Sequence, residues 1–315
     1  MSLPDGHVPD PRRVFGHYEI LAPLGSGGMA EVYRALELEG PRAGQVVALK
    51  RLHPSLATSQ DYVDLFTSEA DLARMLQHRN IVQTYEVGQI RDTYYIAMEF
   101  VDGRDVGAVI KRCRERNISV PTDFALYFVK MLLDALDYAH TLRAPSGRAL
   151  GVVHSDVSPS NLFISRYGEV KLGDFGVARA GLGSSLLDGM VNGKPHYLPP
   201  EADGGELTQA ADLWAASVVL YELLTLQRPF DGPSPAQVRK AVKAGAWRPV
   251  RELRPDVPVA VAELLVRGFA RDPSQRFPSA RAYSDTLTPL YDERYAPPLA
   301  IASLLRGIFG PTLGY

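Results

Sequence analysis

Cysteine is almost absent from this sequence. Cys113 is the single cysteine among 315 residues, so no disulfide can form within the chain. A chain that needs no disulfide suits a reducing compartment, and we expect a cytoplasmic location. Cys113 itself is expected to be an unreactive thiol on a polar helix.

The chain also lacks an excess of charge of either sign. It has 34 Lys and Arg residues against 36 Asp and Glu residues, which gives a net charge of -2 and a pI near 6.4. Proteins that bind nucleic acid usually carry a basic patch or stripe and a high pI. Nucleic acid is therefore not expected as a partner.

Long hydrophobic runs are missing as well. Residues 1–16 are rich in Pro, Gly and Asp and contain no apolar core of a signal peptide, so we expect a flexible leader outside the fold. The most apolar internal run, 214–224, is interrupted by Ser217, Tyr221 and Glu222 and is too short to cross a bilayer. We expect this run to form a buried helix, and we expect no membrane span.

Two different patterns of apolar residues divide the rest of the chain. Between 18 and 100, clusters of β-branched and aromatic residues indicate strands, and apolar residues at three- and four-residue steps predict one helix at 60–77. A few short strands are expected between 152 and 173. After Asp102 the helical pattern dominates, and helices are expected at about 105–116, 122–142, 208–226, 235–244, 258–270 and 279–289.

These patterns predict an α+β protein with two lobes. The N-lobe, 17–101, is expected to be small and β-rich with one main helix, and the C-lobe, 104–290, to be larger and mostly helical, with a hinge near 99–103. The tail, 291–315, is expected to form a short amphipathic helix that packs against the C-lobe rather than docking a partner or a membrane surface, since one Arg supplies little charge. Its apolar positions are Leu299, Ile301, Leu304, Leu305 and Ile308.

Glycines cluster between two strand-like segments. Gly25, Gly27 and Gly28 lie in LGSGGMAEVY, where a backbone without side chains can fold over phosphates and offer its N–H groups. Ala30 stands where a third glycine is usual. Similar patterns mark dinucleotide-binding folds, but there a helix follows, whereas the strand-like residues 31–33 follow here. The pattern favours a phosphate-binding β-hairpin.

Lys50 ends the apolar segment VALK, so its ammonium is expected beside a pocket rather than in open water. A buried ammonium needs anionic partners. Glu69, on the helix expected at 60–77, is the candidate protein partner, and phosphate oxygens would be the others. The alternative is a surface Lys and Glu that never meet.

Two further segments carry groups suited to phosphate chemistry. HSDVSPSNLFIS supplies His154, Asp156 and Asn161 in a turn before a strand. An Asp there can accept or orient the proton of an attacking hydroxyl, and an Asn amide oxygen can ligate a divalent ion. KLGDFGVAR supplies Asp174, a hard oxygen ligand suited to Mg²⁺. The four segments in this order are far more specific than any one of them.

With these four segments the chain resembles the eukaryotic-like protein kinases, and among them the bacterial serine/threonine kinases, over about 18–290. The resemblance implies a two-lobed protein kinase fold and an enzyme that uses ATP and Mg²⁺. It implies that Asp156 is the catalytic aspartate, that Lys50 pairs with Glu69, and that Asn161 and Asp174 bind Mg²⁺. The implied ATP contacts are the phosphate loop Leu24, Gly25 and Gly27, the adenine roof Val32 and Ala48, its floor Phe163, Lys50, the back-pocket residue Met98, the hinge Glu99 to Val101, and Asp105. Asp105 could equally cap the helix that begins there.

Later segments indicate a protein substrate. Small-molecule phosphotransferases share the His-x-Asp-x-x-x-x-Asn loop, so that loop does not decide. The segment 199–201 resembles the element that closes the activation segment of protein kinases, which implies that Glu201 pairs with Arg276 and anchors a shelf for an extended peptide. The resemblance also implies that a buried Asp212 holds the catalytic-loop backbone. We expect protein substrates with Ser or Thr acceptors, which can include the chain itself.

The activation segment departs from the family pattern. Ser155 stands in place of the arginine beside the catalytic aspartate, which normally binds a phosphorylated residue of that segment. Between 180 and 192 the only hydroxyl residues are Ser184 and Ser185. We therefore expect activity not to depend strongly on phosphorylation there.

A second departure concerns the charge next to Asp156. Ser158 stands in place of a lysine whose charge offsets that of the transferring phosphoryl group. Lys194 occupies the position where relatives place a threonine that touches the same lysine and aspartate. The hydroxyl and the ammonium have exchanged places in the sequence, and we expect Lys194 to restore the charge as a catalytic residue. The alternative is that Lys194 points to solvent and the chain is a nucleotide-binding pseudokinase that acts as a signalling scaffold.

Overall fold

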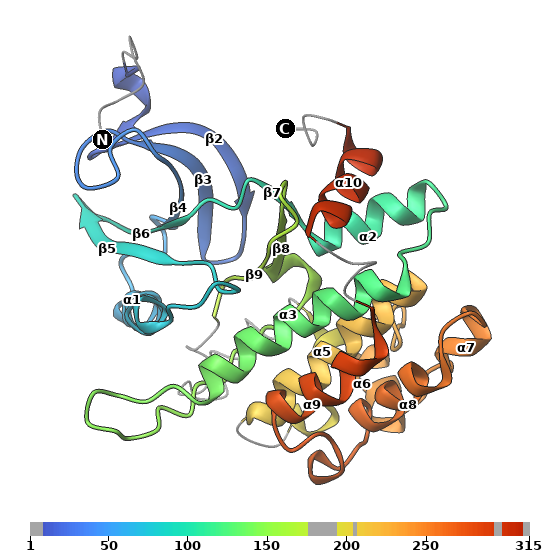
Figure 1. The fold of residues 1–315 in the computed structure, drawn as a ribbon. Helices are drawn as coiled ribbons and strands as arrows, with labels where there is room; N and C mark the ends of the chain where they lie inside the picture. The colour runs from blue at the N-terminus through green and yellow to red at the C-terminus, as the bar shows by residue number, and fades with distance from the viewer. Residues whose placement is uncertain (1–8, 176–193, 204–206, 293–297, 311–315) are drawn as a thin grey trace. The chain divides into compact units, whose positions relative to one another are not determined.

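The computed structural model describes residues 9–175, 194–203, 207–292 and 298–310, apart from the side chain of Glu69. The chain divides into two compact units, both drawn in Figure 1. Unit 1 comprises the residues up to His78 together with Val82–Val101, and unit 2 comprises Arg79–Ile81 together with the residues from Asp102 onwards. The expectation about Ser184 and Ser185 lies outside the described residues.

Unit 1 is built on an antiparallel sheet of six strands, in the order β1-β2-β3-β4-β6-β5 (Figure 1). Each long strand coincides with a β-branched and aromatic cluster of the sequence, as predicted. The strands are β1 (Val14–Phe15), β2 (Tyr18–Ser26), β3 (Ala30–Glu37), β4 (Val46–Leu52), β5 (Thr84–Ile90) and β6 (Thr93–Glu99).

Helix α1 (Gln60–Met75) packs on one face of this sheet and confirms the helix predicted at 60–77. Side chains alternate between the two faces of a strand, so Ala48 and Lys50 point to the same face as Leu52. Leu52 belongs to the cluster that α1 covers, and that face is therefore the α1 face of the sheet. The buried cluster consists of Ala30, Leu52, Val63, Phe66, Ala70 and Ile96.

The expectation of a flexible leader over 1–16 was wrong for its last residues. Pro11–Arg13 form a 3₁₀ turn, η1, and Val14–Phe15 form β1, which pairs with β2. The Asp10 carboxylate caps the turn by accepting from the Arg12 amide at 3.0 Å, and the Asp10 amide donates to Glu19 Oε1 at 2.9 Å. An acidic cap followed by proline is a turn-initiating signal, and it outweighed the polar composition of the segment.

Unit 2 is mostly helical. Its described helices are α2 (Val106–Glu115), α3 (Thr122–His140), α5 (Gln209–Thr225), α6 (Pro235–Ala244), α7 (Val250–Leu253), α8 (Val259–Gly268), α9 (Ala280–Leu287) and α10 (Pro298–Phe309). Helix α5 is buried throughout 211–224 and packs against α3 and α8, which confirms the predicted buried helix (Figure 1). Within the described ranges, no helix has both the length and the apolar character that crossing a membrane requires.

Helix α10 packs against α2, as the sequence analysis expected of the tail (Figure 1). Arg116 donates to the Gly307 carbonyl at 3.2 Å, and the guanidinium of Arg112 lies 5.8 Å from the centre of the Phe309 ring. Cys113 lies on the buried face of α2 rather than on a polar surface, and burial raises the pKa of its thiol. That environment keeps the thiol protonated and unreactive, as expected.

The boundary between the units differs from the expected one, because Arg79–Ile81 belong to unit 2. The Asn80 carbonyl accepts from the Leu172 amide at 2.8 Å, and Asn80 Nδ2 donates to the Val170 carbonyl at 2.8 Å. Ile81 also forms an isolated parallel bridge with Leu172. These bonds tie the segment to a three-stranded sheet made of β7 (Gly103–Asp105), β8 (Leu162–Ser165) and β9 (Val170–Leu172).

Candidate active site

The predicted catalytic loop, 154–161, is held at its start by Asp212 of α5. Asp212 Oδ2 accepts from the His154 amide at 2.8 Å, and Oδ1 accepts from the Ser155 amide at 2.9 Å. His140 Nε2 of α3 also lies 2.8 Å from Oδ2. Ser155 has a φ of 64°, a region that non-glycine residues rarely adopt, so these bonds hold a costly backbone conformation. The expectation that Asp212 is buried and holds this backbone is confirmed.

His154 is buried, and both of its ring nitrogens are engaged. Nε2 lies 3.0 Å from the Gly173 carbonyl, and Nδ1 accepts from the Asp156 amide at 3.2 Å. A carbonyl oxygen can only accept, so Nε2 carries the proton and the ring is neutral. Burial lowers the pKa of His154 and outweighs the opposing effect of Asp212. His154 therefore braces the loop and does not act as a charged group.

Asn161 and Asp156 are brought together within the loop. Asn161 Nδ2 donates to the Asp156 carbonyl and to Asp156 Oδ2, both at 2.9 Å. An amide nitrogen only donates, so these two bonds assign the orientation of the carboxamide. The amide oxygen of Asn161, Oδ1, therefore points away from Asp156. This oxygen is the atom that would bind Mg²⁺ in the predicted role of Asn161.

Lys194 completes this cluster from the segment that follows residue 193. Its Nζ lies 3.0 Å from Asp156 Oδ2, 2.8 Å from Ser158 Oγ and 3.2 Å from Asn161 Oδ1. An ammonium has three protons, one for each of these acceptors. Lys194 thus contacts the serine that replaces the lysine of relatives and does not point to solvent. Its catalytic role remains a prediction.

Asp174 lies two residues after the end of β9 and has a φ of 52°. The amide of the preceding Gly173 donates to the Asn161 carbonyl at 2.9 Å, which joins the two segments that carry the predicted metal ligands. Within the described ranges, no three or more His, Cys, Asp or Glu side chains gather into a group that could hold a metal on its own. One carboxylate and one amide oxygen suit Mg²⁺ when phosphate oxygens and water complete its six ligands, so the residues fit the predicted ion.

Four of the ATP contacts predicted in the sheet of unit 1 share one face, namely Val32, Ala48, Lys50 and Met98. The register pairs Val32 with Lys50, Lys50 with Ile96, and Ala48 with Met98. Directly opposed residues of antiparallel strands point to the same face, and so do residues two positions apart. These four predicted contacts therefore lie on the α1 face, whereas Glu99, the last residue of β6, points to the opposite face.

The hairpin between β2 and β3 carries the predicted phosphate loop. Leu24 is 41% exposed, and a Cβ placed on Gly25 would meet no atom within 4 Å. The Gly27 amide donates to the Ala30 carbonyl at 2.9 Å, and His53 Nε2 lies 2.9 Å from the Gly27 carbonyl. The hairpin thus has open space beside Gly25 and Gly28, whereas the backbone groups of Gly27 are already hydrogen-bonded.

Two other predictions in unit 1 concern the ion pair and the hinge. Glu69 belongs to α1, but its side chain lies outside the described part, so its pairing with Lys50 stays a prediction. The Glu99 amide donates to the Gln83 carbonyl at 2.8 Å, so a ligand would meet the carbonyl of Glu99. Val101 is the last residue of unit 1.

Asp105 and Phe163 are cross-strand partners in the small sheet of unit 2. Asp105 Oδ1 accepts from the Ala108 amide at 2.8 Å and caps α2. The capping alternative is therefore confirmed, and a ribose contact by the same carboxylate stays a prediction. Phe163 is half-buried and points to the opposite face from the buried Leu162 and Ile164.

Glu201 and Arg276 form the expected ion pair, with both ends engaged. Arg276 NH1 lies 2.7 Å from Glu201 Oε1, and NH2 lies 2.8 Å from Oε2. The Arg276 side chain is 0% exposed and also donates to the carbonyls of Ala270 and Ala210. Such a bidentate pair fixes both position and orientation, so it anchors the segment that ends at Glu201.

A small pocket opens beside the Asp156 and Lys194 side chains. Its lining includes these two polar groups and the apolar residues Leu198, Pro199 and Ala211. The pocket has room beside the carboxylate for a group about the size of a water molecule or a hydroxyl. We call residues 194–199 the pocket wall.

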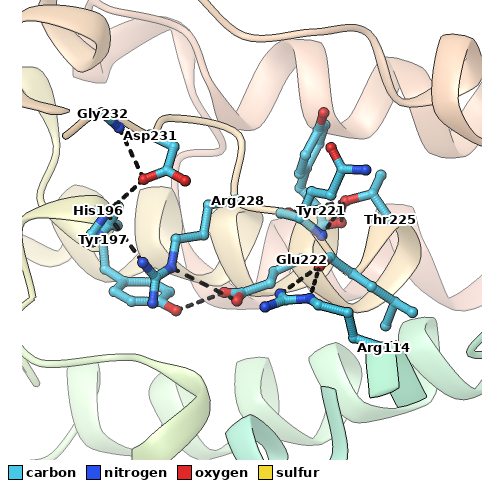
Figure 2. Close-up of polar contacts among 11 residues, drawn as sticks. Arg114, His196, Tyr197, Tyr221, Glu222, Thr225, Arg228, Asp231 and Gly232 are labelled. Atoms are coloured by element: carbon cyan, nitrogen blue, oxygen red, sulfur yellow. Dashed lines mark hydrogen bonds and ion pairs between the residues drawn. The ribbon is translucent and has the colours of Figure 1, made fainter. Parts of the chain in front are cut away.

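A polar network that was not predicted from the sequence binds His196 and Tyr197, in the middle of the pocket wall. The Tyr197 hydroxyl donates to Glu222 Oε2 at 2.6 Å, and Arg228 Nε lies 3.9 Å from Glu222 Oε1 (Figure 2). His196 Nε2 lies 3.2 Å from both Asp231 Oδ1 and Arg228 NH1. Burial and Glu222 raise the pKa of Tyr197, whereas burial and Arg228 lower that of His196. No spacing in the sequence links this segment to α5, so only the folded chain reveals the network.

One known protein family matches most of the chain. The model of the family described as the protein kinase domain matches residues 18–286. The chain belongs to this family. Protein kinases generally depend on ATP and a divalent metal ion.

Relatives of this kinase domain occur among bacterial kinases. It is 37% identical over 305 residues to the tyrosine-protein kinase MasK of Myxococcus xanthus, covering 94% of this chain and 46% of MasK. It is 33% identical over 284 residues to the serine/threonine-protein kinase PrkC of Bacillus subtilis, covering 89% of this chain and 41% of PrkC. The chain spans less than half the length of both relatives.

Solved structures show the same fold. The kinase domain is similar to the PknI kinase domain of Mycobacterium tuberculosis, with a TM-score of 0.64 and 26% identity. The likeness covers 92% of this chain and 100% of that one. The expected α+β, two-lobed protein kinase fold is thereby confirmed.

Proposed function

We propose that this chain is a protein serine/threonine kinase that transfers the γ-phosphoryl group of MgATP to hydroxyl groups of proteins, including copies of itself. The contact that carries the proposal is that of Lys194, whose Nζ lies 3.0 Å from the Asp156 carboxylate and 3.2 Å from Asn161 Oδ1. A pseudokinase scaffold that only binds nucleotide would not need a cation, a proton acceptor and a metal ligand in mutual contact. The relatives MasK and PrkC are both named as kinases.

The residues of the chain divide the work of the transfer. The acceptor oxygen forms a bond to the γ-phosphorus while the bond from that phosphorus to the β,γ-bridging oxygen breaks, and Asp156 takes the hydroxyl proton as ADP leaves. Asn161 orients Asp156 through its Nδ2, and Lys194 offsets charge that develops on the phosphoryl oxygens. Mg²⁺, when bound, would neutralise charge on phosphate oxygens, with Asn161 Oδ1 and the Asp174 carboxylate as its protein ligands. The ATP contacts expected from the sequence, Lys50 among them, are part of the proposal.

The class of acceptor hydroxyl is also part of the proposal, because MasK is named a tyrosine kinase and PrkC a serine/threonine kinase. In serine/threonine relatives a threonine touches the lysine next to the catalytic aspartate. Lys194 and Ser158 restore this hydroxyl–ammonium contact, at 2.8 Å, with the partners exchanged. That contact favours serine and threonine as acceptors.

Transfer of labelled γ-phosphate to myelin basic protein and to the chain itself tests this function. We expect Asp156→Ala to lower labelling by about 10²–10⁴-fold, because the proton acceptor is lost. Asp137→Ala, which removes a carboxylate of α3 that pairs with Arg281, is the matched control. Phosphoserine and phosphothreonine are the expected products. A wild-type chain that binds ATP without labelling any protein would support the pseudokinase, and phosphotyrosine alone would contradict the hydroxyl class.

A further inference from the structure

The end of the pocket wall, 198–199, has few backbone bonds of its own. It lies between two 3₁₀ turns, η5 (Pro195–Tyr197) and η6 (Pro200–Asp203). Pro199 and Pro200 carry no amide hydrogen, so neither can donate to a neighbouring strand or turn. The Ala202 amide donates to the Pro199 carbonyl at 3.1 Å, and beyond this bond the position of the stretch depends on what else binds its two carbonyl oxygens.

A single side chain from α6 binds both carbonyls. Arg239 NH1 lies 3.2 Å from the Leu198 carbonyl oxygen and 3.1 Å from that of Pro199. Its Nε and NH2 donate to Asp203 Oδ1 at 3.0 and 2.6 Å. All three nitrogens of the guanidinium are thus engaged, and the side chain is only 14% exposed. The planar fork makes this arrangement specific to arginine.

Asp203 also binds a second basic residue of α6, Lys243, which has no described contact with the two carbonyls. Lys243 Nζ lies 2.6 Å from Asp203 Oδ2, opposite the oxygen that Arg239 uses. Partial burial raises the pKa of Asp203, but the hydrogen bonds from Lys243 and Arg239 lower it more, so the carboxylate stays charged. Lys243 lies one helical turn after Arg239 on α6 and shares Asp203 with it. Lys243 therefore provides a control that touches the same carboxylate.

We propose that Arg239 is a positioning residue for the protein acceptor, an inference that rests on the proposed kinase function. Leu198 and Pro199 line the same pocket as Asp156 and Lys194, whereas Arg239 lies behind them and reaches the pocket only through their carbonyls. By fixing these two residues, Arg239 sets the shape of the surface on which the acceptor packs. It does not act on ATP or on the proton transfer.

Steady-state kinetics of Arg239→Met, Arg239→Lys and Lys243→Met test the inference, with myelin basic protein as acceptor and ATP hydrolysis as the reaction with water. Arg239→Met is expected to raise KM for the protein about tenfold, because a charged donor to two carbonyls is lost. ATP hydrolysis and KM for ATP should stay within about twofold of wild type. Arg239→Lys keeps the positive charge and the contact with Asp203, but its ammonium cannot span both carbonyls. Its KM for the protein should therefore lie between those of wild type and Arg239→Met. Lys243→Met should match wild type.

Several outcomes would overturn the inference. Equal losses of ATP hydrolysis and protein labelling in Arg239→Met, together with a lower Tm, would mean a purely structural role. If Arg239→Met and Lys243→Met had the same KM for the protein, the pocket wall would not depend on Arg239. If Arg239→Met fails to fold, the kinetic constants of Arg239→Lys are compared with those of Lys243→Met instead. A wild-type chain that labels no acceptor would instead overturn the proposed function, and with it the need for acceptor positioning.

Discussion

Replacing Lys194 with methionine is expected to lower kcat for phosphoryl transfer by about 100-fold. Methionine keeps much of the length and apolar stem of lysine but removes the ammonium that lies 3.0 Å from Asp156 and 2.8 Å from Ser158. Without a cation there, the negative charge of the transferring group goes uncompensated, while ATP binding loses little. The measurement is single-turnover transfer at saturating ATP, with KM for ATP determined in parallel.

Lys171→Met is the matched control for this prediction. Lys171 lies in β9, so its replacement removes the same charge from another part of unit 2. We expect the control to stay within about twofold of wild type. Equal, small effects of the two substitutions would show that Lys194 has no catalytic part.

Replacing Glu201 with alanine is expected to destabilise the protein by about 3–5 kcal/mol. The substitution removes the bidentate carboxylate partner of the Arg276 guanidinium, which is 0% exposed. Its carbonyl contacts with Ala270 and Ala210 cannot neutralise the charge. A domain of this size loses about 2–4 °C of Tm for each kcal/mol, so calorimetry should show a fall of roughly 10 °C.

Arg281→Met provides the contrast for the Glu201 prediction. Arg281 pairs with Asp137 at 2.8 Å, but its side chain is 63% exposed, and water replaces its partner when the pair is broken. We expect a loss of about 0.2–1 kcal/mol. If both substitutions changed Tm by the same small amount, the buried ion pair would not anchor the segment before α5.

The sequence predicted those parts of the fold whose signal is local and repeated. Helices α1 and α5 follow from apolar periodicity and from an apolar run, and both were placed within a few residues. The segment 79–81 was assigned to the wrong unit, because its place depends on bonds between Asn80 and residues of β9 far along the chain. Strand β1 was missed because a strand of only two residues carries no pattern.

The candidate site also has features that could be predicted from the sequence and features that could not. The exchange of Lys194 and Ser158 could be predicted, because both residues depart from a known pattern at known positions. The support of the pocket wall by Arg239 and Glu222 could not be predicted, since α5 and α6 contact 194–203 only in the folded chain. On α6, Arg239 is one of several basic residues, and no spacing distinguishes it from Lys240 or Lys243.

Exchanging the two residues back tests the central claim most directly. Kcat would be measured for Lys194→Thr, for Ser158→Lys and for the double variant. Lys194→Thr should lose about 100-fold, and the double variant, which restores an ammonium next to Asp156, should recover to within about tenfold of wild type. A double variant no more active than Lys194→Thr alone would contradict the account, because the ammonium at this position would then contribute nothing to phosphoryl transfer.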